Sequence, residues 1–134
     1  MHICHEFTVD DLNHLKRGGR VSATTALVGT ILKIKPVMHV DNLGKLVPVG
    51  KAMGRKKSIQ AMADNMAKAQ IMEKGEPIFI SHGDCMEDVE YLKEILTERY
   101  PENPITVGYV GAVIGAHTGA GVLALFYRGK AREL

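Results

Sequence analysis

Short apolar runs alternate with amphipathic helical segments in the C-terminal part of this chain, and this alternation narrows the possible folds most. Residues Arg55–Lys74 carry apolar side chains every three or four positions, which predicts a helix. A second amphipathic helix follows a capping-box pattern at Asp84 and Glu87. The strand-like runs are Pro77–Ser81, Ile105–Val110 and residues 122–128. Because alternating strands and helices pack as layers, the sequence predicts an α/β domain with a mixed β-sheet.

The first third of the chain is predicted to begin with two helices. Thr8 and Asp11 match a capping box and predict a short helix that ends at Gly18. Ser22 is then expected to cap a second helix that runs to Lys33. This part therefore contributes helices before the first predicted strands.

A hairpin is predicted next, with strands at Pro36–Val40 and Leu46–Val49 around a turn at residues 41–44. Pro48 has no N–H to donate to a strand ladder. It therefore confines the second strand to a sheet edge or to a bulge.

The composition is that of an ordinary globular protein, with 46% hydrophobic and 24% charged residues. Seventeen basic and 15 acidic side chains leave a formal charge of +2, which gives no support to nucleic-acid binding. No apolar run approaches the roughly 18 residues of a membrane span, so we expect no stable membrane insertion. Two cysteines, Cys4 and Cys85, cannot form a disulfide framework and indicate a reducing compartment, which predicts a cytoplasmic location.

Metal-binding and cysteine-dependent chemistry have little support in the sequence. Residues 2–5 offer two histidines and a cysteine, but they lie at an N-terminus expected to be frayed and no C-x-x-C pair accompanies them. Cys85 follows His82 by three residues, yet its acidic neighbours Asp84 and Glu87 would raise the pKa of its thiol. We therefore predict no metal, no cofactor and no catalytic residue.

The segment from Gly111 to Gly121 is rich in glycine and alanine, with His117 and Thr118 in its middle. Such a backbone can turn sharply and lets another molecule approach its amide groups. His117, Thr118 and Gly119 are therefore candidates for binding a carboxylate or a phosphate. Close packing of a helix on a strand explains the glycines equally well, and the spacing does not match the dinucleotide-binding fingerprint.

Two further candidates precede the hairpin. Arg20 follows two glycines and offers a forked donor suited to a carboxylate or phosphate, although a solvated surface cation is the plainer interpretation. In the predicted helix after it, Ala26, Gly29 and Thr30 form a thin face. A thin face can line a narrow tunnel for an alkyl chain, but close helix packing is the commoner reason for one.

Arg55 and Lys56 begin a predicted helix, together with Lys57. The helix macrodipole disfavours cations at this end by roughly 0.3–1 kcal/mol each. The run therefore indicates an anion or an acidic partner, and a solvated basic surface screened by salt is the alternative.

Several sequence elements, taken together, resemble those of one protein family. They are LKRGGR, IKP, GRKKS and the GAHTGAG segment that matches GxHTGxG, and they occur in this order within residues 7–129. In these elements the chain resembles the C-terminal half of the DegV family of bacterial fatty-acid-binding proteins. The resemblance implies the C-terminal domain of a two-domain α/β protein that encloses a long-chain fatty acid.

The resemblance also implies a function and residue roles. Such proteins present the acyl carboxylate to a separate fatty acid kinase, which forms an acyl phosphate for phospholipid synthesis, and they are carriers rather than catalysts. His117 would bind the carboxylate and Arg20 would support that polar end. Arg55 would belong to a basic surface used by the kinase or near the transferred phosphate, and the helix from Ser22 to Lys33 would wall part of the acyl tunnel.

The chain departs from the family pattern because the N-terminal domain, which supplies a threonine and a serine to the carboxylate, is missing from it. Residues 1–134 are therefore expected to be a truncated DegV-type lipid-binding domain. A half-open tunnel would weaken lipid binding by several kcal/mol, at roughly 0.8 kcal/mol per CH₂, and would expose an apolar face that favours a homo-oligomer. The alternatives are a structural or dimerisation domain without a ligand, and an enzyme that uses His117 in acyl or phosphoryl chemistry.

Overall fold

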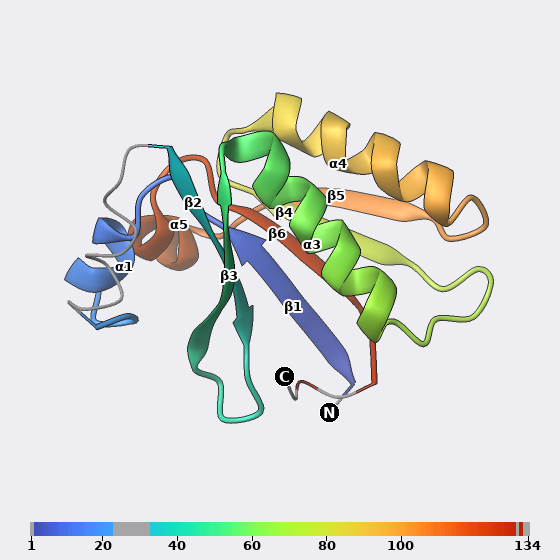
Figure 1. The fold of residues 1–134 in the computed structure, drawn as a ribbon, viewed down its shortest axis with the longest axis horizontal. Helices are drawn as coiled ribbons and strands as arrows, with labels where there is room; N and C mark the ends of the chain where they lie inside the picture. The colour runs from blue at the N-terminus through green and yellow to red at the C-terminus, as the bar shows by residue number, and fades with distance from the viewer. Residues whose placement is uncertain (1, 23–32, 131, 133–134) are drawn as a thin grey trace.

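The computed structural model describes residues 2–22, 33–130 and 132, and its centre is a six-stranded sheet in the order β3-β2-β1-β6-β4-β5 (Figure 1). The strands are β1 (Ile3–Thr8), β2 (Ile34–Val40), β3 (Leu46–Met53), β4 (Ile78–His82), β5 (Ile105–Tyr109) and β6 (Leu123–Arg128). The helices are α1 (Asn13–Arg17), α3 (Arg55–Ala69), α4 (Met86–Arg99) and α5 (Ala112–Thr118). β4 and β5 pair in parallel, and the other pairings are antiparallel. The predicted α/β fold with a mixed sheet is confirmed.

The N-terminal residues form a strand in the middle of the sheet, so the predictions of a frayed end and of a helix cap at Thr8 are wrong. β1 pairs with β2 on one side and with β6 on the other. The Thr8 hydroxyl donates to the Pro36 carbonyl oxygen at 2.7 Å, and α1 begins after Leu12 without a side-chain cap. Because the run ICHEFT places polar residues on both faces, it lacks the apolar alternation that identifies a strand.

α3 and α4 lie side by side over one face of the sheet (Figure 1). α3 ends at Ala69, five residues before the predicted Lys74, because the extended Gln70 forms a bridge with Gly129. α4 begins after Cys85 rather than Asp84, and no side chain of the described residues caps it. The apolar residues buried between these helices and the sheet include Ile59, Met62, Met66, Ile78, Ile80, Val89, Leu92, Leu96, Leu123 and Leu125. This aliphatic and methionine core positions the start of α3 and of α4 at the same end of the sheet.

The predicted hairpin is confirmed. β3 is an edge strand, and its register against β2 shifts between Val37 and Met38, which pair with Gly50 and Pro48 respectively. The strand with the proline is thus both at an edge and bulged. In the turn, one carboxylate oxygen of Asp41 accepts from two backbone N–H groups, which fixes the connection.

The face of the sheet opposite α3 and α4 is covered at one end by a second apolar cluster. This cluster contains Phe7, Val9, Leu12, Leu15, Met38 and Val122. Farther along the strands, Ile3 and Phe79 remain 48% and 46% exposed. Within the described ranges, no helix is long and apolar enough to cross a membrane.

Candidate functional site

Most of the glycine-rich segment is a short helix, α5, and this helix carries His117 near its C-terminal end. The His117 side chain is half-buried, and its Nδ1 lies 2.7 Å from the carbonyl oxygen of Val113, one turn earlier. A carbonyl oxygen only accepts, so Nδ1 carries the hydrogen. No other described residue forms a hydrogen bond with Nε2. The ring is therefore held by one nitrogen, and the other has no hydrogen-bond partner among the described residues.

α5 packs against α1 through two reciprocal contacts between a glycine and a histidine. A Cβ atom at Gly18, just after α1, would overlap Cδ2 of His117. A Cβ atom at Gly119, just after α5, would lie 2.6 Å from Cδ2 of His14. Each imidazole ring thus fills the space that a side chain would need, and glycine at both positions is what lets the helices approach. Close packing thus explains Gly119, but the packing is of α5 on the helix α1 and not of a helix on a strand as expected.

The connection from α5 to β6 is held by a polar network. Gly121 has φ +87°, and a Cβ atom there would overlap the Asp10 carboxylate. Arg55 donates from Nη2 to the Gly121 carbonyl oxygen, from Nη1 to Asp10 at 3.3 Å and from Nε to Asp88 at 2.9 Å. Lys35 adds a second cation 3.8 Å from Asp10. The network joins the ends of β1 and α5 to the starts of α3 and α4.

Arg20 contacts Gly18, the glycine after α1 that packs against the His117 ring. Its Nη1 donates to the Gly18 carbonyl oxygen at 2.6 Å, and the side chain remains exposed. Arg20 also lines a hollow of about 340 Å³ between residues 19–22 and residues 44–46 of the hairpin. Arg20 and His117 therefore both contact Gly18, while the guanidinium group can still reach solvent.

Thr118 is buried, and its hydroxyl donates to the Ile114 carbonyl oxygen at 2.8 Å. Its hydrogen is thus used inside α5, which leaves only acceptor capacity for a ligand. The His14 ring fills the space beside Gly119, the next candidate. Ala26 and Thr30, the candidates in the predicted tunnel helix, lie outside the described residues.

Arg55 and Lys56 are adjacent in sequence but have different surroundings. The Arg55 side chain is only 15% exposed, and its donors face the two carboxylates and the carbonyl group named above. Lys56 is exposed, with Nζ 5.5 Å from the centre of the Tyr91 ring. Their predicted role towards a phosphate or a partner stays a prediction, and for Arg55 it would require a change in the network.

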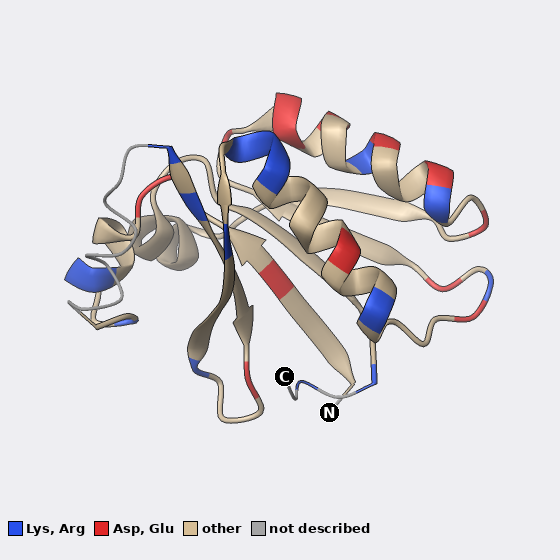
Figure 2. Ribbon diagram, viewed as in Figure 1, with Lys and Arg blue, Asp and Glu red and all other residues tan. Residues whose placement is uncertain are grey.

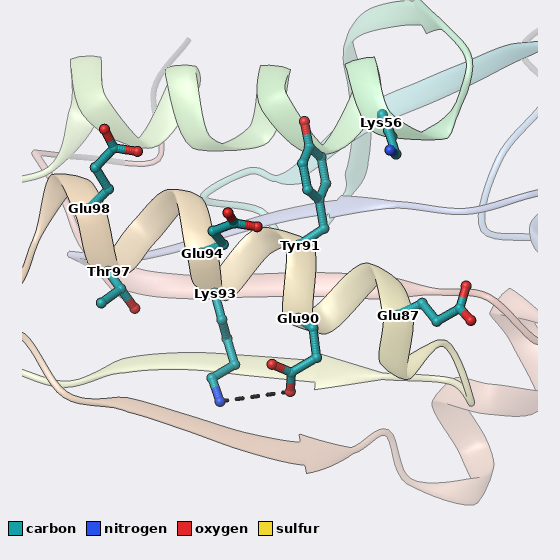
Figure 3. A pocket seen from close by; sticks show the side chains of 8 residues that line it. All are labelled: Lys56, Glu87, Glu90, Tyr91, Lys93, Glu94, Thr97 and Glu98. Atoms are coloured by element: carbon teal, nitrogen blue, oxygen red, sulfur yellow. Dashed lines mark ion pairs between the residues drawn. The ribbon is translucent and has the colours of Figure 1, made fainter.

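A hollow of about 850 Å³ lies along α4 and includes Lys56 but not His117 (Figure 3). Its acidic lining residues are Glu87, Glu90, Glu94 and Glu98. Acidic residues recur along α4, whereas basic residues gather at the start of α3 (Figure 2). A lining this acidic does not suit a carboxylate ligand, so the hollow is not the predicted site.

The pair His82 and Cys85 is not arranged as a nucleophile and its base. The Cys85 backbone N–H donates to His82 Nδ1, and the Cys85 thiol donates to the Val122 carbonyl oxygen at 3.3 Å. Burial raises the pKa of the thiol, although the nearby Arg55 opposes the rise. Burial, rather than Asp84 and Glu87 as the sequence suggested, is thus the main cause. Across the described ranges, no group of three or more His, Cys, Asp or Glu side chains could hold a metal ion.

Sequence reasoning missed several residues that shape the surroundings of His117. His14 and Asp10 fill the space at Gly119 and Gly121, yet nothing in their local pattern shows which glycine they meet. Val113 and Ile114 are 69% and 54% exposed on α5. The helical spacing of Val113 and His117 could have predicted a shared face, had the segment been recognised as a helix.

Comparison with known proteins identifies the relatives of this chain. A family model described as "Uncharacterised protein, DegV family" matches residues 1–130. A DegV domain-containing protein of Clostridium perfringens is 47% identical over 131 residues, which are 98% of this chain and 45% of that protein. The chain thus spans less than half the length of this curated relative.

Solved structures of two other proteins have a similar fold. The fatty acid binding DegV family protein of Streptococcus agalactiae superposes with a TM-score of 0.80 at 32% identity, over 96% of this chain and 45% of that one. The Fatty Acid Kinase (Fak) B3 protein of Streptococcus pneumoniae, loaded with linoleic acid, superposes with a TM-score of 0.86 at 24% identity. That match covers 96% of this chain and 45% of the other, and it supports the fold.

Proposed function

The chain belongs to the DegV family, and from this membership and the geometry around His117 we propose that it forms part of the binding site of a long-chain fatty acid. The fatty acid binding protein of Streptococcus agalactiae shares both the fold and about a third of the residues. A ligand of this kind has an anionic head and an apolar tail. The site must therefore supply one polar anchor and an apolar path.

The observation that carries the proposal is the fixed orientation of the His117 ring. The Val113 carbonyl oxygen and the contact with Gly18 hold the ring in place and leave Nε2 without a described partner. A neutral ring can accept at Nε2 from a carboxylic acid, and an imidazolium can donate from Nε2 to a carboxylate. A ring fixed in advance loses little entropy when the ligand binds.

The exposed apolar residues of α5 support the same ligand. Val113 lies one turn before His117, and Ile114 follows it. Both side chains are more than half exposed, so no described residue covers the apolar surface next to His117. An acyl chain that leaves His117 along this helix would remove apolar surface from water, at roughly 25 cal/mol per Å².

We further propose that the site presents the carboxyl group to a fatty acid kinase rather than reacting itself. The likeness in fold to the Streptococcus pneumoniae protein supports such a partner. Arg20 is exposed and contacts Gly18 beside His117, where it could meet an acyl phosphate. In this proposal the kinase, and not this chain, forms the acyl phosphate.

The test is to extract the purified protein with organic solvent, identify bound lipid by mass spectrometry and titrate the delipidated chain with a C16 fatty acid. His117→Asn retains a donor near the Nδ1 position but removes Nε2, and His117→Gln retains a polar group near Nε2. Loss of a hydrogen bond to a charged group costs about 1.5–3 kcal/mol, so we expect His117→Asn to weaken binding roughly 10- to 100-fold. His117→Gln should weaken it less.

His2→Ala is the control, because His2 contacts the Gly129 carbonyl oxygen at the other end of β1. This variant should bind the fatty acid as the unmodified chain does. Equal affinity in the unmodified chain and in His117→Asn would remove His117 from the site. Absence of any fatty acid, both in the extract and in the titration, would favour a structural domain without a ligand.

A further inference from the structure

A buried carboxyl group on the central strand lies outside the proposed site. Glu6 of β1 is only 4% exposed and faces α3. Oε2 of Glu6 accepts from the Asn65 amide at 3.2 Å. Glu6 takes part in no ion pair among the described residues. A carboxylate on a fully paired strand, without a cation beside it, is costly to bury in its charged form.

The groups that face Glu6 from the neighbouring elements do not supply a charge. On β6, Tyr127 is buried. Among the buried side-chain polar atoms of the described residues, only the Tyr127 hydroxyl lacks a hydrogen-bond partner. On β2, the residue directly opposite Glu6 is the buried His39, whose pKa is lowered by burial. On β1 itself, Cys4 has a thiol whose pKa burial raises. From α3 comes Asn65, which is uncharged.

We propose that Glu6 is a proton-dependent switch for the packing of α3 on the sheet. With its carboxyl group protonated, the helix packs tightly on β1. When the group ionises, the buried charge loosens this interface. The proposal rests on the polar cluster of Glu6, Asn65 and Tyr127 between α3, β1 and β6, and it does not depend on fatty acid binding.

The switch operates near neutral pH because burial raises the pKa of Glu6 from 4.5 to about 7, although the hydrogen bond from Asn65 opposes the rise. The folded state therefore holds a proton that the unfolded state has already lost between pH 4.5 and 7. The stability that this proton contributes is complete below pH 4.5 and is lost as the pH rises to about 7.

Other buried groups act in the opposite direction and must be separated from Glu6. Burial lowers the pKa of His5 and of His39, so each contributes stability above its ordinary value of 6.5 that is lost as the pH falls. The pH dependence of the unmodified chain is a sum of these effects. The difference between the unmodified chain and Glu6→Gln isolates the carboxyl group, because glutamine has the same shape and cannot ionise.

The experiment is denaturant unfolding of the unmodified chain, Glu6→Gln and the control Glu98→Gln from pH 4.5 to 8. Glu98 is an exposed residue of α4. We expect the unfolding constant of the unmodified chain, relative to Glu6→Gln, to rise on the order of a hundredfold between pH 4.5 and 7. Glu98→Gln should follow the unmodified chain at every pH. Parallel curves for the unmodified chain and Glu6→Gln would overturn the proposal.

Two measurements on the unmodified chain test the proposal even if Glu6→Gln fails to fold. When the glutamate carboxyl groups are titrated and followed by carbon-13 NMR, the resonance of Glu6 should shift with a midpoint near pH 7. Amide exchange in α3 around Asn65, corrected for the intrinsic rate, should speed up between pH 6 and pH 8 on the order of tenfold. An ordinary midpoint near 4.5, or unchanged exchange, would show that Glu6 is no switch.

Discussion

Single atoms decide much of the geometry beside His117, and Gly121 shows this most directly. Its φ of +87° is a left-handed conformation, and its missing Cβ leaves space for the Asp10 carboxylate. Gly44 in the hairpin turn has a similar φ of +78°, but no atom of a described residue lies within 4 Å of its Cβ position. Comparing substitutions at the two glycines therefore separates the energetic cost of backbone strain from that of steric overlap.

Gly121→Ala should lower the free energy of unfolding by about 2–4 kcal/mol, because strain and overlap with Asp10 add. Gly44→Ala should lower it by only about 1 kcal/mol, since strain acts alone there. Denaturant unfolding of both variants checks the difference. Equal losses would mean that Asp10 moves aside without cost.

At the scale of elements, Arg55 connects segments that are distant in sequence. Its guanidinium group bonds to Asp10 after β1, to Asp88 in the first turn of α4 and to the carbonyl group that follows α5. The ends of four elements thus meet at one side chain, and the position of α5 depends on it.

Removing the negative charge of Asp88, a partner of Arg55, should therefore lower the stability of the folded chain. Asp88→Asn should lower the free energy of unfolding by about 1–3 kcal/mol, because the Arg55 side chain is mostly buried and loses one of its two carboxylates. Glu102→Gln, which breaks the exposed pair with Lys74, should cost less than about 1 kcal/mol. The comparison uses thermal or denaturant unfolding, and equal costs for the two variants would contradict a stabilising role for Arg55.

The elements that were predicted correctly are those whose pattern is local. The apolar spacing of α3 and α4 and the turn residues of the hairpin identify them without knowledge of neighbours. β1 was missed because its burial comes from β2, β6 and α3, which no local pattern shows. α5 was missed because its glycines, which serve contacts with α1, resemble turn residues.

At the scale of the whole molecule, the helices are distributed unevenly over the sheet. α3 and α4 cover one face, whereas part of the other face leaves Phe79 46% and Ile3 48% exposed. An exposed apolar surface on a sheet binds apolar molecules and favours contact with other proteins. The expected homo-oligomer through such a face stays a prediction.

Phe79→Lys should reduce the binding of a fluorescent hydrophobic dye and change the free energy of unfolding by less than about 0.5 kcal/mol, since the side chain is already half exposed. Leu43→Lys is the control, because Leu43 is 78% exposed in the hairpin turn, away from this face. It should leave dye binding unchanged. An equal effect of both variants would show that the dye does not bind the sheet.

By itself, the amino-acid sequence determined the α/β class, the hairpin with its edge proline and the family, because these depend on local spacing and on short motifs. It also singled out His117. Only the tertiary structure decided how the His117 ring is held, which groups surround Arg55 and that Glu6 is buried with no ion pair to another described residue. The physical reason is that burial and close contact are properties of pairs of segments far apart in the chain, so no single segment encodes them.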